Sequence, residues 1–284
     1  MQKLLAFIDA SIYSKSVCDH AGWIAQKTGA EVDLFHVIGR RETGESRQNL
    51  SGNITLGARS ALLAELSALD EQRGRLAQKR GRAILEDGEA LLRAAGAKTV
   101  TSRLRIGDIV ETACDFEGEA DMIMIGKRGE AADFAKLHLG SNLERIARAA
   151  SKPLFVTSRG FQEPKTIMIA YDGGASSMKA VDYVARSPLF AGLTCHVVTV
   201  AADTAEPRRM LDDAKAMLAG GGYQVEIDVL QGPPEAAISE AVTQKSIDLL
   251  VMGAYGHSRI RSMIIGSTTS EVLRLCKIPV VLFR

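Results

Sequence analysis

Short apolar runs alternate along the chain with longer stretches in which apolar residues recur every three or four positions. Runs such as LLVMG at 249–253 and VVTV at 197–200 contain no regular polar alternation. This is typical of strands that helices cover on both faces. The longer stretches have the period of amphipathic helices. The alternation predicts βαβ units, a parallel sheet and therefore an α/β fold.

The pattern occurs twice. LLAFIDASIYSKSV at 4–17 resembles IMIAYDGGASSMKA at 167–180, and DMIMIGKRG at 121–129 resembles DLLVMGAYG at 248–256. Asp9 and Asp172 are 163 residues apart, whereas Gly126 and Gly253 are 127 apart, so the first copy contains 36 additional residues. The repeat predicts two domains, 1–160 and 161–284, joined by a linker near 160–164.

Strand and helix positions follow from the same runs. Strands are expected in the first copy at 3–8, 31–38, 98–105, 121–126 and 152–157. In the second copy they are expected at 166–171, 193–200, 224–230, 248–253 and 278–283. The helices of the second copy are expected at 175–187, 205–219, 233–244 and 267–276.

The additional residues of the first copy, at about 40–97, are predicted to form a helical insertion consisting of one long amphipathic helix. Its apolar positions follow three-, four- and seven-residue spacings: Leu62, Leu66, Leu69, Leu76, Ile84 and Leu91. Small residues recur seven apart on another part of its surface: Ser60, Ser67, Gly74, Gly81 and Gly88. These small residues either face solvent or admit a close partner helix.

The composition excludes several classes of protein. With a net charge of +1, the chain has no charge surplus that would indicate binding to nucleic acid or to a membrane surface. It contains no run of about 20 apolar residues, and its first residues read as a strand and not as a signal peptide. We therefore expect a cytoplasmic protein. Four scattered cysteines and unclustered histidines indicate no structural metal, and the cysteines read as small apolar residues.

A glycine motif carries the candidate chemistry. Gly253 and Gly256 follow a buried strand, and nine residues later Gly266-Ser267-Thr268 opens a helix. Glycine lets the backbone approach a ligand closely, and the N–H groups at a helix start attract anions, so the motif predicts a phosphate site. In the alternative interpretation, Gly253 ends a strand and Thr268 caps the helix in a capping box. The Walker A and GxGxxG motifs are absent.

The pattern G-x2-G-x9-G-[ST], after a strand that ends in Asp and small residues, resembles the nucleotide motif of the universal stress protein family. The resemblance covers nearly the whole chain, twice. It implies an adenine nucleotide alpha hydrolase-like fold with two tandem open parallel five-stranded sheets of order 3-2-1-4-5. It also implies that the fifth strands of the two halves pair within the chain, as they do in the family's dimer. A further homodimer stays open.

The same resemblance implies a stress-response sensor or regulator that binds ATP, ADP or AMP, with Mg²⁺ as an accompanying ion, and acts on an unidentified protein partner. In the second copy it assigns the base and ribose to the ends of three strands and the phosphates to the glycine motif. These residues are Ala170, Tyr171, Asp172, Val200, Met252, Gly253, Gly256, Gly266, Ser267 and Thr268. The alternatives are that Asp172 caps a helix and that Val200 is a core residue.

The first copy matches less well. Its corresponding residues are Asp9, Gly126, Gly129, Gly140, Ser141 and Asn142. Ten residues separate Gly129 from Gly140, and Asn142 replaces the threonine, so the resemblance favours nucleotide binding in the second copy. Ser141 and Glu144 again have the spacing of a capping box. Lys127 and Arg128 either attract phosphate or are solvated.

Two other functions stay open. Slow ATP hydrolysis or self-phosphorylation would use Ser267 or Thr268 as acceptor. Phosphoryl transfer needs a positioned base and cations, and only His257, Arg259 and Arg261 lie near the motif, so the sequence favours binding over turnover and assigns no catalytic residue. The other alternative is a protein-interaction module without nucleotide, in which the inserted helix covers the first site or recruits a partner.

Overall fold

The computed structural model describes residues 1–39, 56–130, 139–254 and 266–284, with side chains of the second helix described from residue 64 onward. The first half contains β1 (Lys3–Phe7), α1 (Tyr13–Thr28), β2 (Glu31–Gly39), α2 (Leu56–Ala94), β3 (Val100–Gly107), α3 (Ile109–Phe116), η1 (Glu117–Glu119), β4 (Met122–Gly126), α4 (Ser141–Ala149) and β5 (Leu154–Thr157). The second half contains β6 (Thr166–Ala170), α5 (Ala175–Arg186), η3 (Pro188–Phe190), β7 (Thr194–Val200), α6 (Ala205–Gly220), β8 (Val225–Leu230), α7 (Pro234–Gln244), β9 (Leu249–Gly253), α8 (Ser267–Leu275) and β10 (Val280–Phe283).

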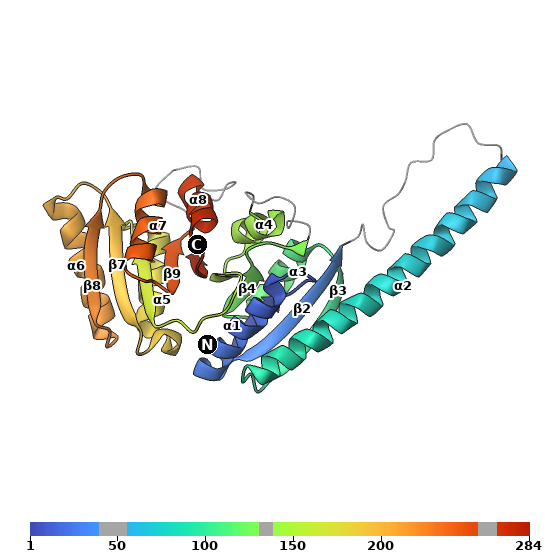
Figure 1. The fold of residues 1–284 in the computed structure, drawn as a ribbon, viewed down its shortest axis with the longest axis horizontal. Coiled ribbons are helices and arrows are strands. Elements are labelled where there is room, and N and C mark those ends of the chain that lie inside the picture. The colour runs from blue at the N-terminus through green and yellow to red at the C-terminus, as the bar shows by residue number, and fades with distance from the viewer. Residues whose placement is uncertain (40–55, 131–138, 255–265) are drawn as a thin grey trace.

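Ten strands of the described residues form one sheet, in the order β3-β2-β1-β4-β5-β10-β9-β6-β7-β8 (Figure 1). Within each half the strands are parallel, and the halves join where β5 and β10 pair antiparallel, with Val281 opposite Phe155. The predicted α/β fold is confirmed, and the two five-stranded sheets are continuous. The division of the chain at residue 160 stays a prediction, because the two halves share this sheet.

The inner strands bury side chains on both faces of the sheet, whereas the edge strands β3 and β8 are only partly covered. In β1, Leu4 and Ala6 belong to the core on one face, and Leu5 and Phe7 to the core on the other. Helices α1, α2, α5 and α6 supply the first core, and α3, α4, α7 and α8 supply the second. Because helices cover both faces of the inner strands, these strands show no polar alternation, as their sequence predicts.

Helix α2 is an extended crossover helix. It connects β2 to β3, as the shorter α6 connects β7 to β8, and it runs well past the edge of the sheet (Figure 1). The predicted single long helix is therefore present between Leu56 and Ala94, while residues 40–55 lie outside the described part.

Of the two interpretations of the small residues on this helix, solvent exposure is wrong for Gly81 and Gly88. Both are buried against strand side chains, and Cys18 of helix α1 also lies beside Gly88. A Cβ at Gly88 would lie 2.6 Å from Ile8 Cδ1 and 2.9 Å from Leu34 Cδ2. Glycine thus lets α2 approach the strands at these two positions.

At the junction, each half extends a cationic side chain to the C-terminal end of a helix in the other half. Lys127, which follows β4, donates through Nζ to the carbonyl of Cys276 at the end of α8, 2.5 Å away. Arg284, which follows β10, donates to the carbonyl of Arg148 near the end of α4. Cations are favourable at helix C-termini, where the carbonyl groups carry partial negative charge. Lys127 is only 9% exposed, so neither predicted role, phosphate contact or solvation, is correct. Burial lowers its pKa to about 8.

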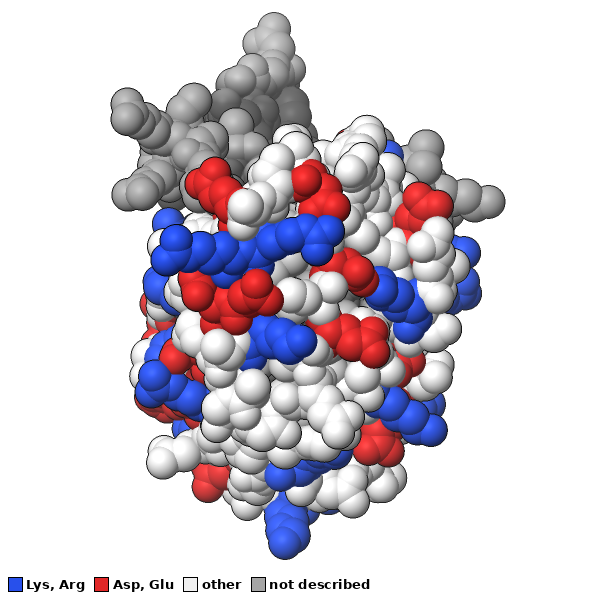
Figure 2. Space-filling model, turned by 90° about the vertical axis from the view of Figure 1, so that its left-hand side faces the viewer, with Lys and Arg blue, Asp and Glu red and all other residues white. Residues whose placement is uncertain are grey.

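The described surface shows no concentration of one charge on the side formed by α6 and β8. Figure 2 shows lysine and arginine interspersed with aspartate and glutamate there. Among the described residues, no helix is long and apolar enough to cross a membrane, and no group of three or more His, Cys, Asp or Glu is placed to hold a metal. Cys18, Cys195 and Cys276 are buried and Cys114 is exposed.

A buried histidine lies where α1 meets β5 and the segment that joins the halves. The His20 ring packs against Phe155 and, edge-on, against Phe161. Its Nδ1 donates to the carbonyl of Ser16 at 2.7 Å, and its Nε2 has no hydrogen-bond partner among the described residues. Burial lowers the pKa of His20 to about 4, although the Ser16 carbonyl and Asp19 act in the opposite direction. The fold therefore requires the neutral ring.

This burial predicts an acid-sensitive contribution to stability. Between about pH 6.5, the ordinary pKa of histidine, and pH 4, the unfolded chain binds the proton that the folded chain rejects, so stability falls as the pH falls. His20→Phe retains a ring but does not titrate. We expect its free energy of unfolding to fall by about 2 kcal/mol less between pH 7 and pH 5 than that of the unmodified protein. Urea unfolding at both pH values measures it. An equal loss in both proteins would contradict the assignment.

Candidate functional site

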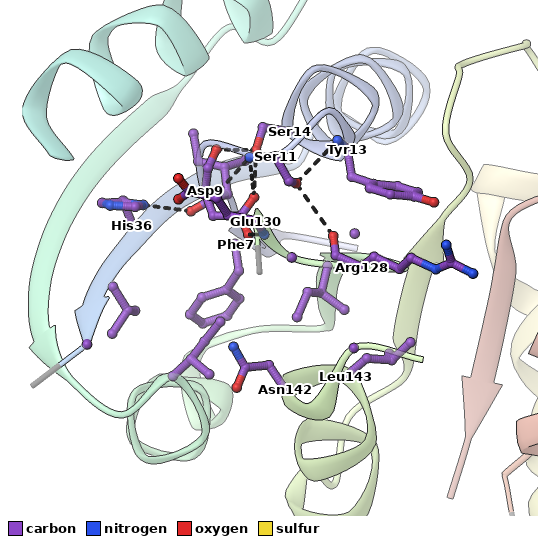
Figure 3. A pocket seen from close by; sticks show the side chains of 18 of the residues that line it. Phe7, Asp9, Ser11, Tyr13, Ser14, His36, Arg128, Glu130, Asn142 and Leu143 are labelled. Atoms are coloured by element: carbon purple, nitrogen blue, oxygen red, sulfur yellow. Dashed lines mark hydrogen bonds between the residues drawn. The ribbon is translucent and has the colours of Figure 1, made fainter. Parts of the chain in front are cut away.

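A cavity of about 810 Å³ lies at the carboxyl ends of the strands in the first half. Its walls come from the β1–α1 connection, the ends of β2, β3 and β4, the first turn of α4, and one side of α2. Figure 3 shows Asp9, Ser11 and Ser14 on one side of the cavity and Asn142 and Leu143 on another. Open parallel sheets bind ligands at this edge, because the connections on either side diverge there.

The cavity brings together the six residues of the first half that match the family motif. All six line it: Asp9, Gly126, Gly129, Gly140, Ser141 and Asn142. They come from the β1–α1 connection and, more than a hundred positions later, from the two ends of the β4–α4 connection. The connection between Gly129 and Gly140 is one residue longer than its counterpart in the second half. Of this connection, residues 131–138 lie outside the described residues.

Asp9 is held by its own local turn. Its Oδ1 accepts from the backbone N–H of Ser11 at 2.9 Å and from the hydroxyl of Ser14 at 3.2 Å. Its Oδ2 accepts from the N–H of Glu130 at 3.0 Å, across the cavity edge. The carboxylate therefore fastens the start of α1 to the segment that follows the second glycine of the motif.

The second half repeats this turn around Asp172. There Oδ1 accepts from the N–H of Gly174 at 2.9 Å and from the hydroxyl of Ser177 at 2.6 Å. The donors stand two and five residues after the aspartate in both halves. Asp172 thus stabilises the turn before α5.

The motif glycines of the first half allow close packing. A Cβ at Gly126 would lie 2.6 Å from Tyr13 Cβ, and one at Gly129 would lie 2.9 Å from Asp9 Oδ2. Either contact would force the start of α1 and the β4 connection apart. Since these two segments form adjacent walls of the cavity, glycine at 126 and 129 maintains its shape.

The helices that follow the motifs begin without side-chain caps. Gly140 is the N-cap of α4 and Gly266 that of α8, and neither helix has a side-chain cap hydrogen bond. Both predicted capping boxes are therefore wrong: Ser141 and Thr268 lie inside the first turns. Glycine cannot cap through a side chain, so the helix starts leave N–H groups for an anion.

The described residues of the second-half candidate site also gather at one edge. Strand register places Ala170 beside Met252, with Val200 two residues beyond Val198, the neighbour of Ala170 in β7. Tyr171 and Met252 are buried, so they offer backbone groups. Gly253 follows Met252, while Gly266, Ser267 and Thr268 begin α8. Gly256 and the candidates His257, Arg259 and Arg261 lie outside the described residues.

Thr269, which the sequence analysis did not select, fastens this helix to the strand. It is buried, and its hydroxyl donates to the carbonyl of Ala254 at 3.2 Å. The N–H of Gly266 donates to the same carbonyl at 3.4 Å. These two bonds hold the start of α8 beside the end of β9.

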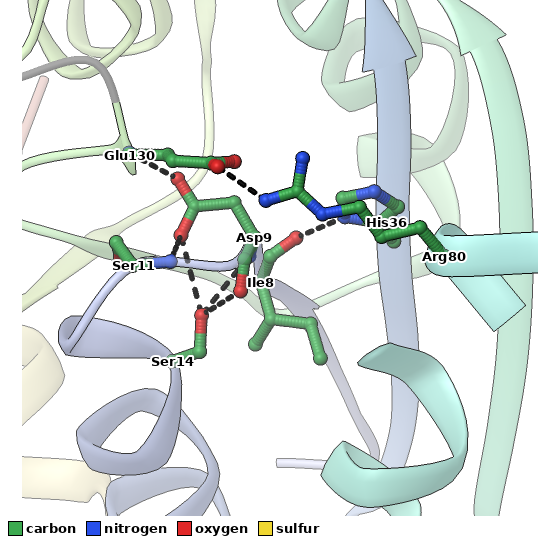
Figure 4. A network of polar contacts seen from close by, with 7 residues as sticks. All are labelled: Ile8, Asp9, Ser11, Ser14, His36, Arg80 and Glu130. Carbon is green, nitrogen blue, oxygen red and sulfur yellow. Dashed lines mark hydrogen bonds and ion pairs between the residues drawn. The ribbon is translucent and has the colours of Figure 1, made fainter. Parts of the chain in front are cut away.

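Several polar residues of the first cavity also escaped the sequence analysis. Arg80 of α2 forms an ion pair with Glu130, and His36 of β2 donates through Nδ1 to the carbonyl of Ile8 at 2.9 Å (Figure 4). Asp108 caps α3 and pairs with Arg145. Partial burial raises the pKa of Asp108, but hydrogen bonds from Arg145 and two backbone N–H groups bring it below its ordinary value. No repeat or motif marks these residues.

Comparison with known proteins identifies the family. The model of the universal stress protein family matches residues 1–158 and 163–284. The chain belongs to the universal stress protein family. The Synechocystis universal stress protein Slr1230 is 38% identical over 287 residues, which cover 100% of both chains. The resemblance inferred from the glycine motif is thereby confirmed.

Solved structures show the same fold. A universal stress protein from Archaeoglobus fulgidus covers 99% of this chain and 98% of its own, with a TM-score of 0.74 and 20% identity. Another universal stress protein, solved in complex with cAMP, is 26% identical, covers 43% of this chain and 98% of its own, and has a TM-score of 0.38. The complex with cAMP is described for that protein.

The aspartate turn yields a stability prediction. Ser177→Ala removes the hydroxyl that donates to Asp172, so we expect the free energy of unfolding to fall by about 1–2 kcal/mol. The neighbouring Ser176→Ala serves as the matched control and is expected to change it by less than about 0.5 kcal/mol. Urea unfolding measures both. Equal effects at the two serines would contradict the role of the turn.

Proposed function

We propose that this universal stress protein binds ATP or another adenine nucleotide in the first-half cavity, and a second nucleotide at the equivalent residues of the second half. In this proposal nucleotide binding serves a stress-response sensor or regulator. One observation carries the proposal: six residues selected by the family motif, from three separate segments, line a single cavity.

The cavity suits the size and shape of a nucleotide. Small-molecule sites usually have volumes of about 300–1,000 Å³ and combine apolar walls with a few fixed polar groups. Phe7, Val37, Ile109 and Leu143 give an apolar wall at the strand ends. A flat aromatic base would be stabilised by such a wall, because the contact removes apolar area of both the base and the wall from water.

The polar groups suit the rest of the molecule. The start of α4, capped by Gly140, presents N–H groups and the positive end of the helix dipole, which favour phosphate. Asp9 is a fixed hydrogen-bond acceptor, as a ribose hydroxyl or an adenine amino group requires. Gly126 and Gly129 place backbone between these two regions without side chains.

The second half supports a second site by repetition. Its aspartate turn has the same kinds of donor at the same spacing. The N-cap residue of α8 is a glycine, as in α4, and neither helix has a side-chain cap hydrogen bond. The two halves thus share the groups that we assign to ribose and phosphate. Mg²⁺ would accompany ATP through the phosphates.

Calorimetric titration of the nucleotide-free chain with ATP tests this function. We expect two nucleotides per chain, and we expect Asp9→Ala and Asp172→Ala each to lose one because each removes the acceptor of one half. Asp212→Ala, on an exposed part of α6, is the control and should bind two. Circular dichroism establishes that the variants fold. Absence of binding by the unmodified chain would overturn the proposal.

A further inference from the structure

Helix α2 forms a wall of the first cavity because glycine lets it lie against the sheet. A Cβ at Gly81 would be 2.6 Å from Leu104 Cδ1 and 3.0 Å from His36 Cδ2. With this close approach, three residues on the same side of the helix, Ala77, Arg80 and Ile84, line the cavity. The long helix therefore contributes a cation to a site whose other residues come from the strand ends.

Arg80 reaches the segment that follows the motif glycines. Its Nη2 pairs with the carboxylate of Glu130, and the N–H of Glu130 donates to Asp9 Oδ2 at 3.0 Å. Figure 4 shows Glu130 between Arg80 and Asp9, with the guanidinium of Arg80 directed at Glu130. Because Glu130 directly follows Gly129, the guanidinium lies about one side-chain length from the glycine backbone that separates the groups assigned to ribose from those assigned to phosphate.

The second half differs in charge at the corresponding place. Arg80 and Glu206 each stand fourteen residues before the last residue of α2 and α6. Glu206 lies in the first turn of α6, where an acidic side chain is favourable to the helix. The two halves therefore share the aspartate turn and the glycine-capped helix but carry opposite charges at this position.

We propose that Arg80 binds phosphate and makes the first cavity prefer nucleotides with two or three phosphates to those with one or none. The inference rests on the proposed function. In the structure Arg80 and Glu130 are both about half exposed, and ion pairs of this kind contribute little to stability. A guanidinium makes paired hydrogen bonds to phosphate oxygens, so it exchanges Glu130 for phosphate at little cost.

The charges around the cavity support this exchange. Three carboxylates line it, Asp9, Asp108 and Glu130, and all of them repel a polyphosphate. Asp108 is paired with Arg145 and Asp9 accepts three hydrogen bonds, so Glu130 is the carboxylate that Arg80 balances through an ion pair. Without Arg80, Glu130 would repel each added phosphate.

Titration of the full chain with ATP, ADP, AMP and adenosine tests the proposal. In Arg80→Gln we expect ATP binding at one site to weaken about tenfold, ADP less, AMP about twofold, and adenosine not at all, because each lost contact is to phosphate. Glu130→Gln removes the repulsion and should strengthen ATP binding a few-fold. The matched control is Arg75→Gln, since Arg75 is on the same helix, is exposed, and pairs with Glu71 at 2.5 Å.

The outcomes separate this inference from the proposed function. If the unmodified chain binds ATP but Arg80→Gln binds all four ligands as before, the inference is wrong and the proposed function stands. If Arg80→Gln weakens adenosine as much as ATP, Arg80 has only a structural role and the inference is also wrong. If the unmodified chain binds none of the four ligands, both are overturned.

Discussion

The parallel pairing of strands within each half is the constraint on which the rest of the structure depends. It brings the carboxyl ends of β1 and β4 side by side, so that Asp9 and Gly126, 117 positions apart in the sequence, line one cavity. The antiparallel contact of β5 with β10 then places the carboxyl edge of each half beside the amino edge of the other. For this reason Lys127 meets the end of α8, and Arg284 meets the end of α4.

These cross-contacts join the two candidate sites to one framework. The helices whose first turns we assign to phosphate, α4 and α8, each receive a cation from the opposite half at their last turn. A cation there offsets the partial negative charge of the last carbonyl groups and so stabilises the helix. The aspartate turns fix α1 and α5 in the same way in both halves. Each site is thus built largely by one half and supported by the other.

The sequence was sufficient for the fold and for the residues at the strand ends. Two apolar repeats identify the strands, and the family resemblance carried by the glycine motif implies their order and points to the six residues that line the first cavity. It was insufficient where partners are distant in sequence. Gly81 faces the sheet because of a helix register that spacing alone does not determine, and Lys127 is buried by a helix 149 residues away. The apparent capping boxes failed because glycine, which has no side chain to cap with, precedes both helices. Arg80 belongs to no motif, so only the packing of α2 reveals it.

A crystal structure of the full chain with a non-hydrolysable ATP analogue tests the central claim most directly. The account predicts analogue density in the first-half cavity, with the base against the apolar wall near Val37 and a phosphate at the first turn of α4. Density for the analogue at another place on the chain, with the first cavity filled by solvent, would contradict it.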